Sequence, residues 1–179
     1  GWPSVSVVVP AHNEERVIKR CVQSILGQAY PDLELIVVLD RCTDGTRALL
    51  EPIAAEDDRL TLLINESCPS DWAGKCHAAR LGARQAQGDR LLFIDADTCC
   101  EPELFKSAIR IADTSNIALL SLLSTLTCEQ DFERTAQPVA SMALMTLYPP
   151  DLVNREPKGR PFANGQFMLF NRASYESIG

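Results

Sequence analysis

The chain has 179 residues and a mass of 19.7 kDa, which fits one compact domain. Its 46% hydrophobic and 23% charged residues are typical of a folded domain and exclude a disordered tail, a collagen-like fibre and a coiled coil. With 17 Lys and Arg against 24 Asp and Glu, the net charge of -7 offers no basic surface for nucleic acid. No apolar run reaches the roughly 18 residues that predict a membrane-spanning helix.

Apolar runs alternate with amphipathic segments along the chain. In chain order we expect a strand at Val5–Val9, a helix at Glu14–Leu26, a strand at Leu33–Leu39, a helix from Thr43 to Ala55, a strand at Leu60–Ile64, a helix at Gly74–Gln87, a strand at Leu91–Ile94, a helix from Glu101 to Ala112, and strands at Ile117–Leu123 and Gln166–Phe170. The Pro-rich stretch from Tyr148 to Pro161 is interpreted as a loop over the ligand site.

This alternation predicts an α/β fold with a mostly parallel, Rossmann-like sheet and helices on both faces. Ligands bind to such sheets beyond the carboxyl ends of the strands. We expect residues 1–179 to form one domain of a longer protein, truncated at both ends, because the chain opens Gly-Trp-Pro without a methionine. The seven cysteines lack CxxC spacing and suggest free thiols in a reducing compartment.

Polar residues follow three of the expected strands. They are Pro10-Ala11-His12-Asn13-Glu14 after the first strand, Asp40 to Asp44 after the second and Asp95-Ala96-Asp97 after the fourth. Carboxylates that converge on one edge repel each other unless a cation or hydrogen-bond donors compensate them. A divalent metal ion and a sugar nucleotide would supply both.

Asp95-Ala96-Asp97 is a DxD sequence at a strand end. In extended backbone, residues one apart project to the same side, so one carboxylate can meet a ribose hydroxyl while the other meets Mg²⁺ or Mn²⁺. The alternative is that both aspartates only cap the next helix. The position after a buried strand favours the ligand site.

Four other residues have both a ligand-binding and a purely structural interpretation. Asp40 can accept the imide N–H of uracil or an amino group of another base, or it is a turn residue. Asn13 and Glu14 lie where a helix should begin, and taken alone they are more typical of an N-cap than of a nucleotide site. Lys75 lies just inside a helix N-terminus, where a diphosphate would compensate an unfavourable cation, although a solvated surface lysine explains it equally well.

Four segments in this order resemble the GT-A glycosyltransferases of family 2: residues 7–14, residues 37–46, Gly74-Lys75 and Asp95-Ala96-Asp97. The stretch Asp71–Lys75 further resembles the lipid-acceptor subset, such as hopanoid-associated and ceramide glucosyltransferase-like enzymes. The resemblance implies inverting transfer of a sugar from a nucleotide diphosphate donor, expected to be a UDP-sugar, to a hydroxyl acceptor, with a lipid among the candidates. It also implies Mg²⁺ or Mn²⁺ as cofactor and a parent protein anchored at the cytoplasmic face of a membrane.

Carried over by position, the resemblance distributes these residues around the donor. Pro10, Ala11, Asn13 and Glu14 line the nucleoside, Asp40 binds the base, Lys75 approaches the base or diphosphate, Asp95 and the adjoining Ala96 lie near the ribose, and Asp97 binds the metal. Asp95 and Asp97 are the expected catalytic pair. The chain departs from the family pattern at Leu39, where Asp is frequent, and at Cys42, where Ser is common.

The general base of an inverting enzyme is expected beyond Gly179, because Glu176 lies in a helical pattern typical of a solvated acid. The alternative function is therefore a module or inactive fragment that binds a nucleotide sugar without turnover. A nucleotidyltransferase is a weaker third candidate, because residues 10–14 contain no glycine for a phosphate loop.

Overall fold

The computed structural model describes residues 1–123, 131–154, 159 and 162–178. The chain divides into two units, one made of Gly1–Ser121 with Gly165–Gly179 and the other of Leu122–Asn164. All of the predicted site residues lie in the first unit.

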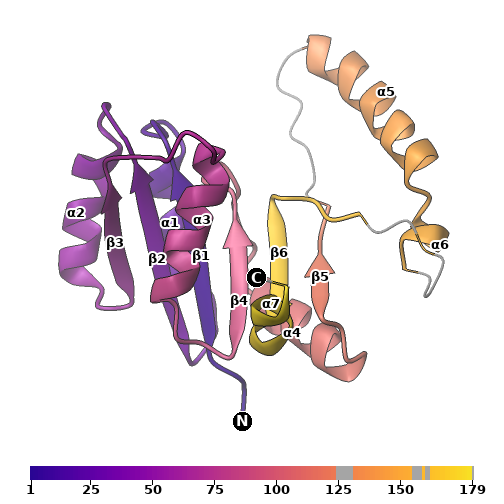
Figure 1. The fold of residues 1–179 in the computed structure, drawn as a ribbon, viewed down its shortest axis with the longest axis horizontal. Helices are drawn as coiled ribbons and strands as arrows, with labels where there is room; N and C mark the ends of the chain where they lie inside the picture. The colour runs from indigo at the N-terminus through magenta and orange to yellow at the C-terminus, as the bar shows by residue number, and fades with distance from the viewer. Residues whose placement is uncertain (124–130, 155–158, 160–161, 179) are drawn as a thin grey trace. The chain divides into compact units, whose positions relative to one another are not determined.

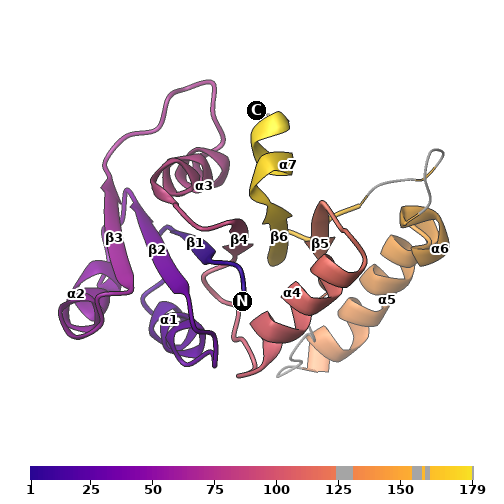
Figure 2. The same ribbon diagram turned by 90° about the horizontal axis from the view of Figure 1, so that it is seen from below.

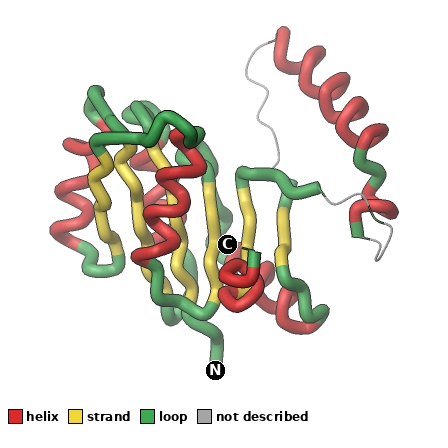
Figure 3. Tube along the Cα trace, in the orientation of Figure 1, coloured by secondary structure: helices red, strands yellow, loops and turns green. Residues whose placement is uncertain are grey.

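The first unit is built on a six-stranded sheet with the order β3-β2-β1-β4-β6-β5 (Figure 1 and Figure 3). Its strands are β1 (Val5–Ala11), β2 (Leu33–Asp40), β3 (Leu60–Asn65), β4 (Arg90–Ile94), β5 (Leu119–Ser121) and β6 (Phe167–Asn171). β1 pairs in parallel with β2 and β4, and β2 with β3, whereas β6 runs antiparallel to β4 and β5. The predicted α/β class with a mostly parallel sheet is confirmed.

Helices cover both faces of this sheet. They are α1 (Ile18–Leu26), α2 (Thr46–Glu56), α3 (Gly74–Gln85), α4 (Leu104–Thr114) and α7 (Arg172–Ser177). Figure 2 shows α3 and α7 on one face and α1, α2 and α4 on the other. The central strands are accordingly mostly apolar, and Val7, Val8 and Val9 of β1 are fully buried.

Several predicted elements are shorter in the structure, above all the first helix and the fifth strand. α1 begins at Ile18 rather than at Glu14, and residues 15–17 form turns before it. The backbone N–H groups of Glu14 and Glu15 donate to Thr46 Oγ1 and Asp44 Oδ2. β5 spans only Leu119–Ser121, the stretch that pairs with β6.

The second unit contains α5 (Asp131–Leu147) and α6 (Pro150–Val153). α5 was not predicted, and α6 occupies part of the stretch that was predicted as a loop. The remainder of that loop at 155–158 and 160–161 lies outside the described residues. Within the described part of the chain, no helix has both the length and the apolar character to cross a bilayer.

Gly82 in α3 lets the helix lie directly on the sheet. A Cβ at this position would stand 2.4 Å from Val8 Cγ1 and 3.1 Å from Val38 Cγ2. Replacing a helical glycine with alanine normally stabilises the helix by up to about 1 kcal/mol. Here the overlap reverses the sign, so we expect Gly82→Ala to lower the free energy of unfolding by about 1–3 kcal/mol, measured by urea denaturation.

Gln85→Ala, at an exposed position of the same helix, is the matched control and should change the free energy of unfolding by less than about 0.5 kcal/mol. Equal or greater stability of the Gly82→Ala protein would contradict the close approach of α3 to β1.

Candidate active site

The carboxyl ends of β1, β2, β3 and β4 meet at one edge of the sheet (Figure 1). The carboxyl-edge site is made of residues 10–15, 40–46, 65, 74–75, 95–97 and 165–166, which come together there. The predicted convergence of three polar strand ends at this edge is present in the structure, and hydrogen bonds and ion pairs connect them.

Asn13 joins the loops that follow β1 and β2. Its backbone is left-handed, with φ of 58°, a conformation that asparagine tolerates better than most residues. Its Oδ1 accepts hydrogen bonds from the backbone N–H groups of Thr43 at 2.7 Å and Asp44 at 3.3 Å. The side-chain oxygen expected to contact the nucleoside therefore holds the two loops together.

Pro10 and Ala11, which were predicted to line the nucleoside, expose little of their side chains. Ala11 is 1% exposed, and its carbonyl oxygen accepts a hydrogen bond from Cys42 Sγ at 3.4 Å. Pro10 is half-buried within β1. A nucleoside at this edge would meet mainly backbone atoms of β1 and the polar groups that follow it.

Asp40 is the most buried acid of the site, with 3% of its surface exposed. Its Oδ1 accepts hydrogen bonds from Arg41 Nε at 3.1 Å and from Asn65 Nδ2 at 2.6 Å, and its Oδ2 accepts one from Arg41 Nη2 at 2.7 Å. The hydrogen bonds from Arg41, assisted by Asn65, hold the pKa of Asp40 below its ordinary value despite the opposing effect of burial. The carboxylate predicted to bind the base is thus already paired within the chain.

Arg41 and Asn65 are site residues that sequence reasoning missed. The backbone of Arg41 is left-handed, with φ of 50°, and its N–H donates to the carbonyl oxygen of Asn65 at 2.7 Å. Such a conformation costs a non-glycine residue on the order of 1 kcal/mol and persists where neighbours hold it. The one signal for Asn65 was its position as the polar residue directly after an apolar strand.

The start of α3 lies beside the Asp40–Arg41 pair. A Cβ on Gly74 would stand 2.5 Å from Arg41 Nη2 and 3.1 Å from Asp40 Oδ2. Glycine at this position therefore lets the helix begin against the ion pair. Through Gly74, the end of β2 and the N-terminus of α3 form one continuous surface.

Lys75 bridges from α3 to the end of β4. Its Nζ lies 2.6 Å from Asp95 Oδ1, and the two side chains are 59% and 23% exposed. The anion that compensates this cation at a helix N-terminus is thus Asp95, not the diphosphate considered from the sequence. An exposed pair of this kind contributes only about 0–1 kcal/mol, so an anionic ligand can compete for the lysine.

The DxD segment is a turn, closed by a hydrogen bond from Thr98 N to Asp95 O at 3.0 Å. The prediction that both carboxylates project the same way from extended backbone is therefore wrong. Ala96 is 4% exposed, whereas Asp97 is exposed. Among the residues that the structure describes, none makes a hydrogen bond or ion pair with the Asp97 carboxylate.

The pKa of Glu14 is affected by the acidic residues around it. Its pKa is raised by burial and then by the nearby carboxylates of Asp97, Asp44 and Asp95, with only a small opposing effect from His12. No group of three His, Cys, Asp or Glu side chains in the described part of the chain forms a ready metal cage. Mg²⁺ and Mn²⁺ commonly take one or two carboxylates together with substrate phosphates and water, and the exposed Asp97 beside this negative potential fits that mode.

The segment before β6 also reaches this edge. Because β6 is antiparallel to β4, it begins where β4 ends. The carbonyl oxygen of Gln166 accepts a hydrogen bond from Asp95 N at 3.4 Å, and a Cβ on Gly165 would stand 3.8 Å from Lys75 Nζ. Residues 165–166 thus border the Lys75–Asp95 pair.

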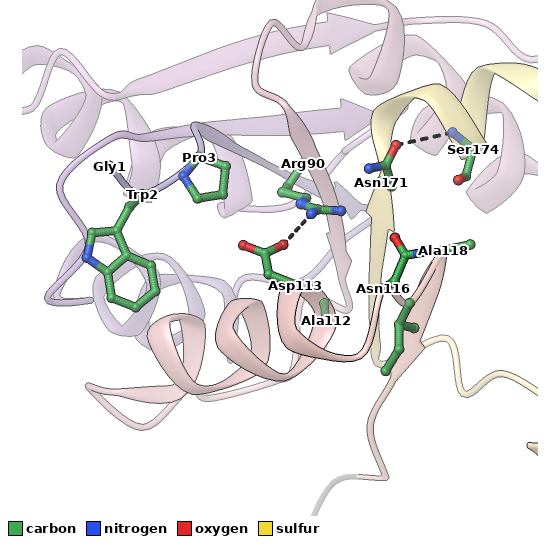
Figure 4. A pocket seen from close by; sticks show the side chains of 11 residues that line it. Gly1, Trp2, Pro3, Arg90, Ala112, Asp113, Asn116, Ala118, Asn171 and Ser174 are labelled. Atoms are coloured by element: carbon green, nitrogen blue, oxygen red, sulfur yellow. Dashed lines mark hydrogen bonds and ion pairs between the residues drawn. The ribbon is translucent and has the colours of Figure 1, made fainter.

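A cavity of about 690 Å³ lies at the opposite, amino-terminal edge of the sheet (Figure 4). It is lined by the N-terminal residues Gly1 to Pro3, the end of α4 and the end of β6, with an ion pair between Arg90 and Asp113 on its wall. The predicted site residues are absent from its lining. The cavity is therefore separate from the carboxyl-edge site.

The mostly parallel sheet of this order, with acidic turns after β1, β2 and β4, matches the GT-A fold of nucleotide-sugar-dependent glycosyltransferases. The model of the family "Glycosyl transferase family 2" matches residues 6–179. The chain belongs to glycosyltransferase family 2. This family assignment confirms the resemblance seen in the four sequence segments.

Solved structures and relatives agree with this assignment. A mannosyltransferase from Pyrobaculum calidifontis in complex with GDP-Man and Mn²⁺ is 25% identical, with a TM-score of 0.71 over 100% of this chain and 47% of that chain. TarS of S. aureus in complex with UDP-GlcNAc has the same fold, with a TM-score of 0.72 at 19% identity over 98% of this chain and 47% of that chain.

Two relatives are similar in sequence over part of the chain. A probable glycosyltransferase, YdaM of Bacillus subtilis, is 35% identical over 55% of this chain and 24% of its own length. The GalNAc(5)-diNAcBac-PP-undecaprenol beta-1,3-glucosyltransferase of Campylobacter jejuni is 30% identical over 53% of this chain and 30% of its own length. The match thus spans about a quarter to a third of these longer proteins.

The paired state of Asp40 predicts an acid-sensitive contribution to stability. A carboxyl group whose pKa is lowered by folding stabilises the protein above its unfolded pKa, and this stabilisation is lost as the pH falls through the folded pKa. We expect Asp40→Asn to lower the urea midpoint at pH 7 and to flatten the loss of stability that the parent shows below about pH 4.

Glu51→Gln, which removes an exposed i,i+4 pair with Arg47, is the control and should leave that pH dependence unchanged. Parallel pH profiles for the parent and the Asp40→Asn protein would contradict the paired Asp40.

Proposed function

We propose that this domain transfers a glycosyl group, with inversion, from a nucleoside diphosphate sugar to a hydroxyl acceptor, and that the donor binds at the carboxyl-edge site. The observation that carries the proposal is the gathering of the exposed Asp97 and the nearby Glu14 at one edge of the sheet, beside the Lys75–Asp95 pair. This juxtaposition suits a diphosphate that arrives with a divalent cation. The solved mannosyltransferase with GDP-Man and Mn²⁺ supports the same donor class.

Each residue then has a definite task. Asp97 would hold Mg²⁺ or Mn²⁺ together with diphosphate oxygens, and the ion would act as a Lewis acid on the leaving diphosphate. Lys75 would turn from Asp95 to the diphosphate, because the exposed pair is weak. Asp95, released from Lys75, would accept a hydrogen bond from a ribose hydroxyl.

The base is a separate question. The expectation of a UDP-sugar needs Asp40 as a free acceptor for the imide N–H of uracil. Asp40 is only 3% exposed, and both of its oxygens accept hydrogen bonds from Arg41 or Asn65, so little of the carboxylate is open to uracil.

For the acceptor we propose a lipid or lipid-linked hydroxyl, with the domain working at the cytoplasmic face of a membrane. The Campylobacter jejuni relative is named for an undecaprenol-linked substrate, which supports this class. In the segment Asp71–Lys75, Trp72 is 36% exposed, with Arg80 over its ring at 5.4 Å. The Trp72 side chain lies just before the start of α3, where an acceptor could contact it.

The general base of the transfer is proposed to lie outside residues 1–179. Glu176, the acid considered from the sequence, is 63% exposed on α7 and lies 3.6 Å from Arg172. Such a side chain is in the state expected of a solvated acid. The alternative function, a module that binds a nucleotide sugar without turnover, shares every donor contact and differs only in this step.

Removing the proposed metal ligand should weaken nucleotide binding. We expect Asp97→Asn to reduce the Mn²⁺-dependent affinity for GDP and UDP at least tenfold, measured by isothermal titration calorimetry, because a disturbed metal site typically loses ten- to hundredfold. Asp58→Asn, an exposed aspartate that precedes β3, is the matched control and should bind as the parent does. Unchanged Mn²⁺-dependent binding by the Asp97→Asn protein would sink the proposed metal site.

Turnover separates the transferase from the binding module. We expect the 179-residue chain to bind donor but to release nucleoside diphosphate well below the roughly 1–1,000 s⁻¹ usual for enzymes, because the general base is proposed to lie outside these residues. Release should be Mn²⁺-dependent and should disappear in the Asp97→Asn protein. Transfer to an acceptor at an ordinary enzymatic rate would show that the base is present among these residues.

A further inference from the structure

The guanidinium of Arg41 stands at the end of β2 with only part of its hydrogen-bonding capacity used. Nε and Nη2 each donate to the Asp40 carboxylate, at 3.1 Å and 2.7 Å. Of the five N–H donors of an arginine, three therefore remain, and the side chain is 42% exposed. A buried carboxylate thus holds a cation whose free edge faces outward at the carboxyl-edge site.

We propose that Arg41, rather than Asp40, contacts the base of the donor and selects guanine over uracil. This inference rests on the proposed function, since it concerns the base of the same nucleotide. It adds a specificity-determining residue at a position that the sequence motifs did not single out.

The preference follows from which hydrogen-bonding groups each base offers. The O6 and N7 atoms of guanine are two neighbouring acceptors on an open edge and match the paired N–H donors of an arginine. Uracil offers carbonyl oxygens beside an imide N–H donor, and a guanidinium has no acceptor for it. Cytosine offers O2 and N3 as neighbouring acceptors, but its O2 adjoins the glycosidic nitrogen, where the ribose hinders approach.

Several contacts fix Arg41 for this role. Its left-handed backbone, with φ of 50°, is held by the hydrogen bond from its N–H to Asn65 O at 2.7 Å. Asn65 Nδ2 also donates to Asp40 Oδ1 at 2.6 Å, so Asn65 holds the backbone of Arg41 with its carbonyl oxygen and the carboxylate of Asp40 with its side chain. The absent Cβ of Gly74 leaves room for Nη2.

The place of Arg41 along the edge also agrees with a base contact. Gly74 separates the Arg41 guanidinium from Lys75, whose Nζ reaches Asp95. Two cations therefore lie on either side of the α3 N-terminus, one against β2 and one against β4. A nucleotide with its diphosphate near Lys75 can direct its base toward Arg41.

Calorimetric titrations with Mn²⁺ and four probes test this inference: GDP, UDP, CDP and ribose 5-diphosphate, which lacks a base. We expect the parent chain to bind GDP roughly ten- to hundredfold more tightly than UDP, the discrimination that a good bidentate contact provides. Arg41→Ala should lose this preference and still bind ribose 5-diphosphate as the parent does. Arg41→Lys should also lose most of it, because an ammonium cannot reproduce the planar pair of donors.

Two further variants complete the design. Gly74→Ala should give the same loss of preference. The new Cβ would lie 2.5 Å from Arg41 Nη2, so the guanidinium would have to move. Arg47→Ala is the matched control, since Arg47 is an exposed arginine paired with Glu51 on α2 at 2.7 Å, and it should keep the parent's preference. Circular dichroism confirms that each variant is folded before it is titrated.

The outcomes distinguish this inference from the proposed function. A parent chain that binds none of the four probes would overturn the proposed function itself. A parent that binds ribose 5-diphosphate but prefers UDP, or binds CDP as tightly as GDP, would overturn the choice of guanine. A guanine preference that survives in the Arg41→Ala protein would overturn the role of Arg41.

Discussion

The parallel pairing of β1 with its two neighbours is the constraint on which the site depends. Val5–Ala11 lies in register with Leu33–Leu39, and Val5–Val8 lies in register with Arg90–Phe93. Both pairings bury apolar side chains under helices on the two faces, and a shift in register would bring polar residues into the core. With the strands aligned in this way, the chain must turn after each one at the same edge, and its polar residues gather there.

Within the described residues, some carboxylates at this edge are paired with a cation of the chain and others are not. Asp40 and Asp95 have cations of the chain beside them, Arg41 and Lys75. Glu14 lies near the carboxylates of Asp97, Asp44 and Asp95, and its pKa is raised first by burial and then by these carboxylates. Hydrogen-bond donors thus stand beside an acidic patch, the arrangement that the proposed nucleoside diphosphate with its counter-ion would require.

Much of the fold and part of the site could be predicted from local pattern. The apolar run Val5–Val9 and the polar turn after it predict a buried strand that ends at a ligand site. The position of Lys75 favours an anionic partner, because a cation is unfavourable at a helix N-terminus. The pairing of Asp40 with Arg41 and Asn65 depends on contacts across the sheet, so local pattern could not show it. The turn at Asp95 likewise depends on contacts with the segment before β6, which is distant in the sequence.

The missed helix α5 has a physical explanation as well. Residues 136–147 contain no charged side chain, and Pro138 lies inside the helix. This part of the helix therefore lacks the charged face by which an amphipathic helix is recognised. For this reason no helix was predicted in the stretch before Tyr148.

A crystal structure of the chain with GDP and Mn²⁺ tests most directly whether the donor binds at the carboxyl edge. The account predicts that the ion lies on Asp97, that the diphosphate lies beside Lys75 at the start of α3, and that the Lys75–Asp95 contact has opened. It is contradicted if that contact stays closed and the nucleotide lies elsewhere, for example in the cavity beside Arg90.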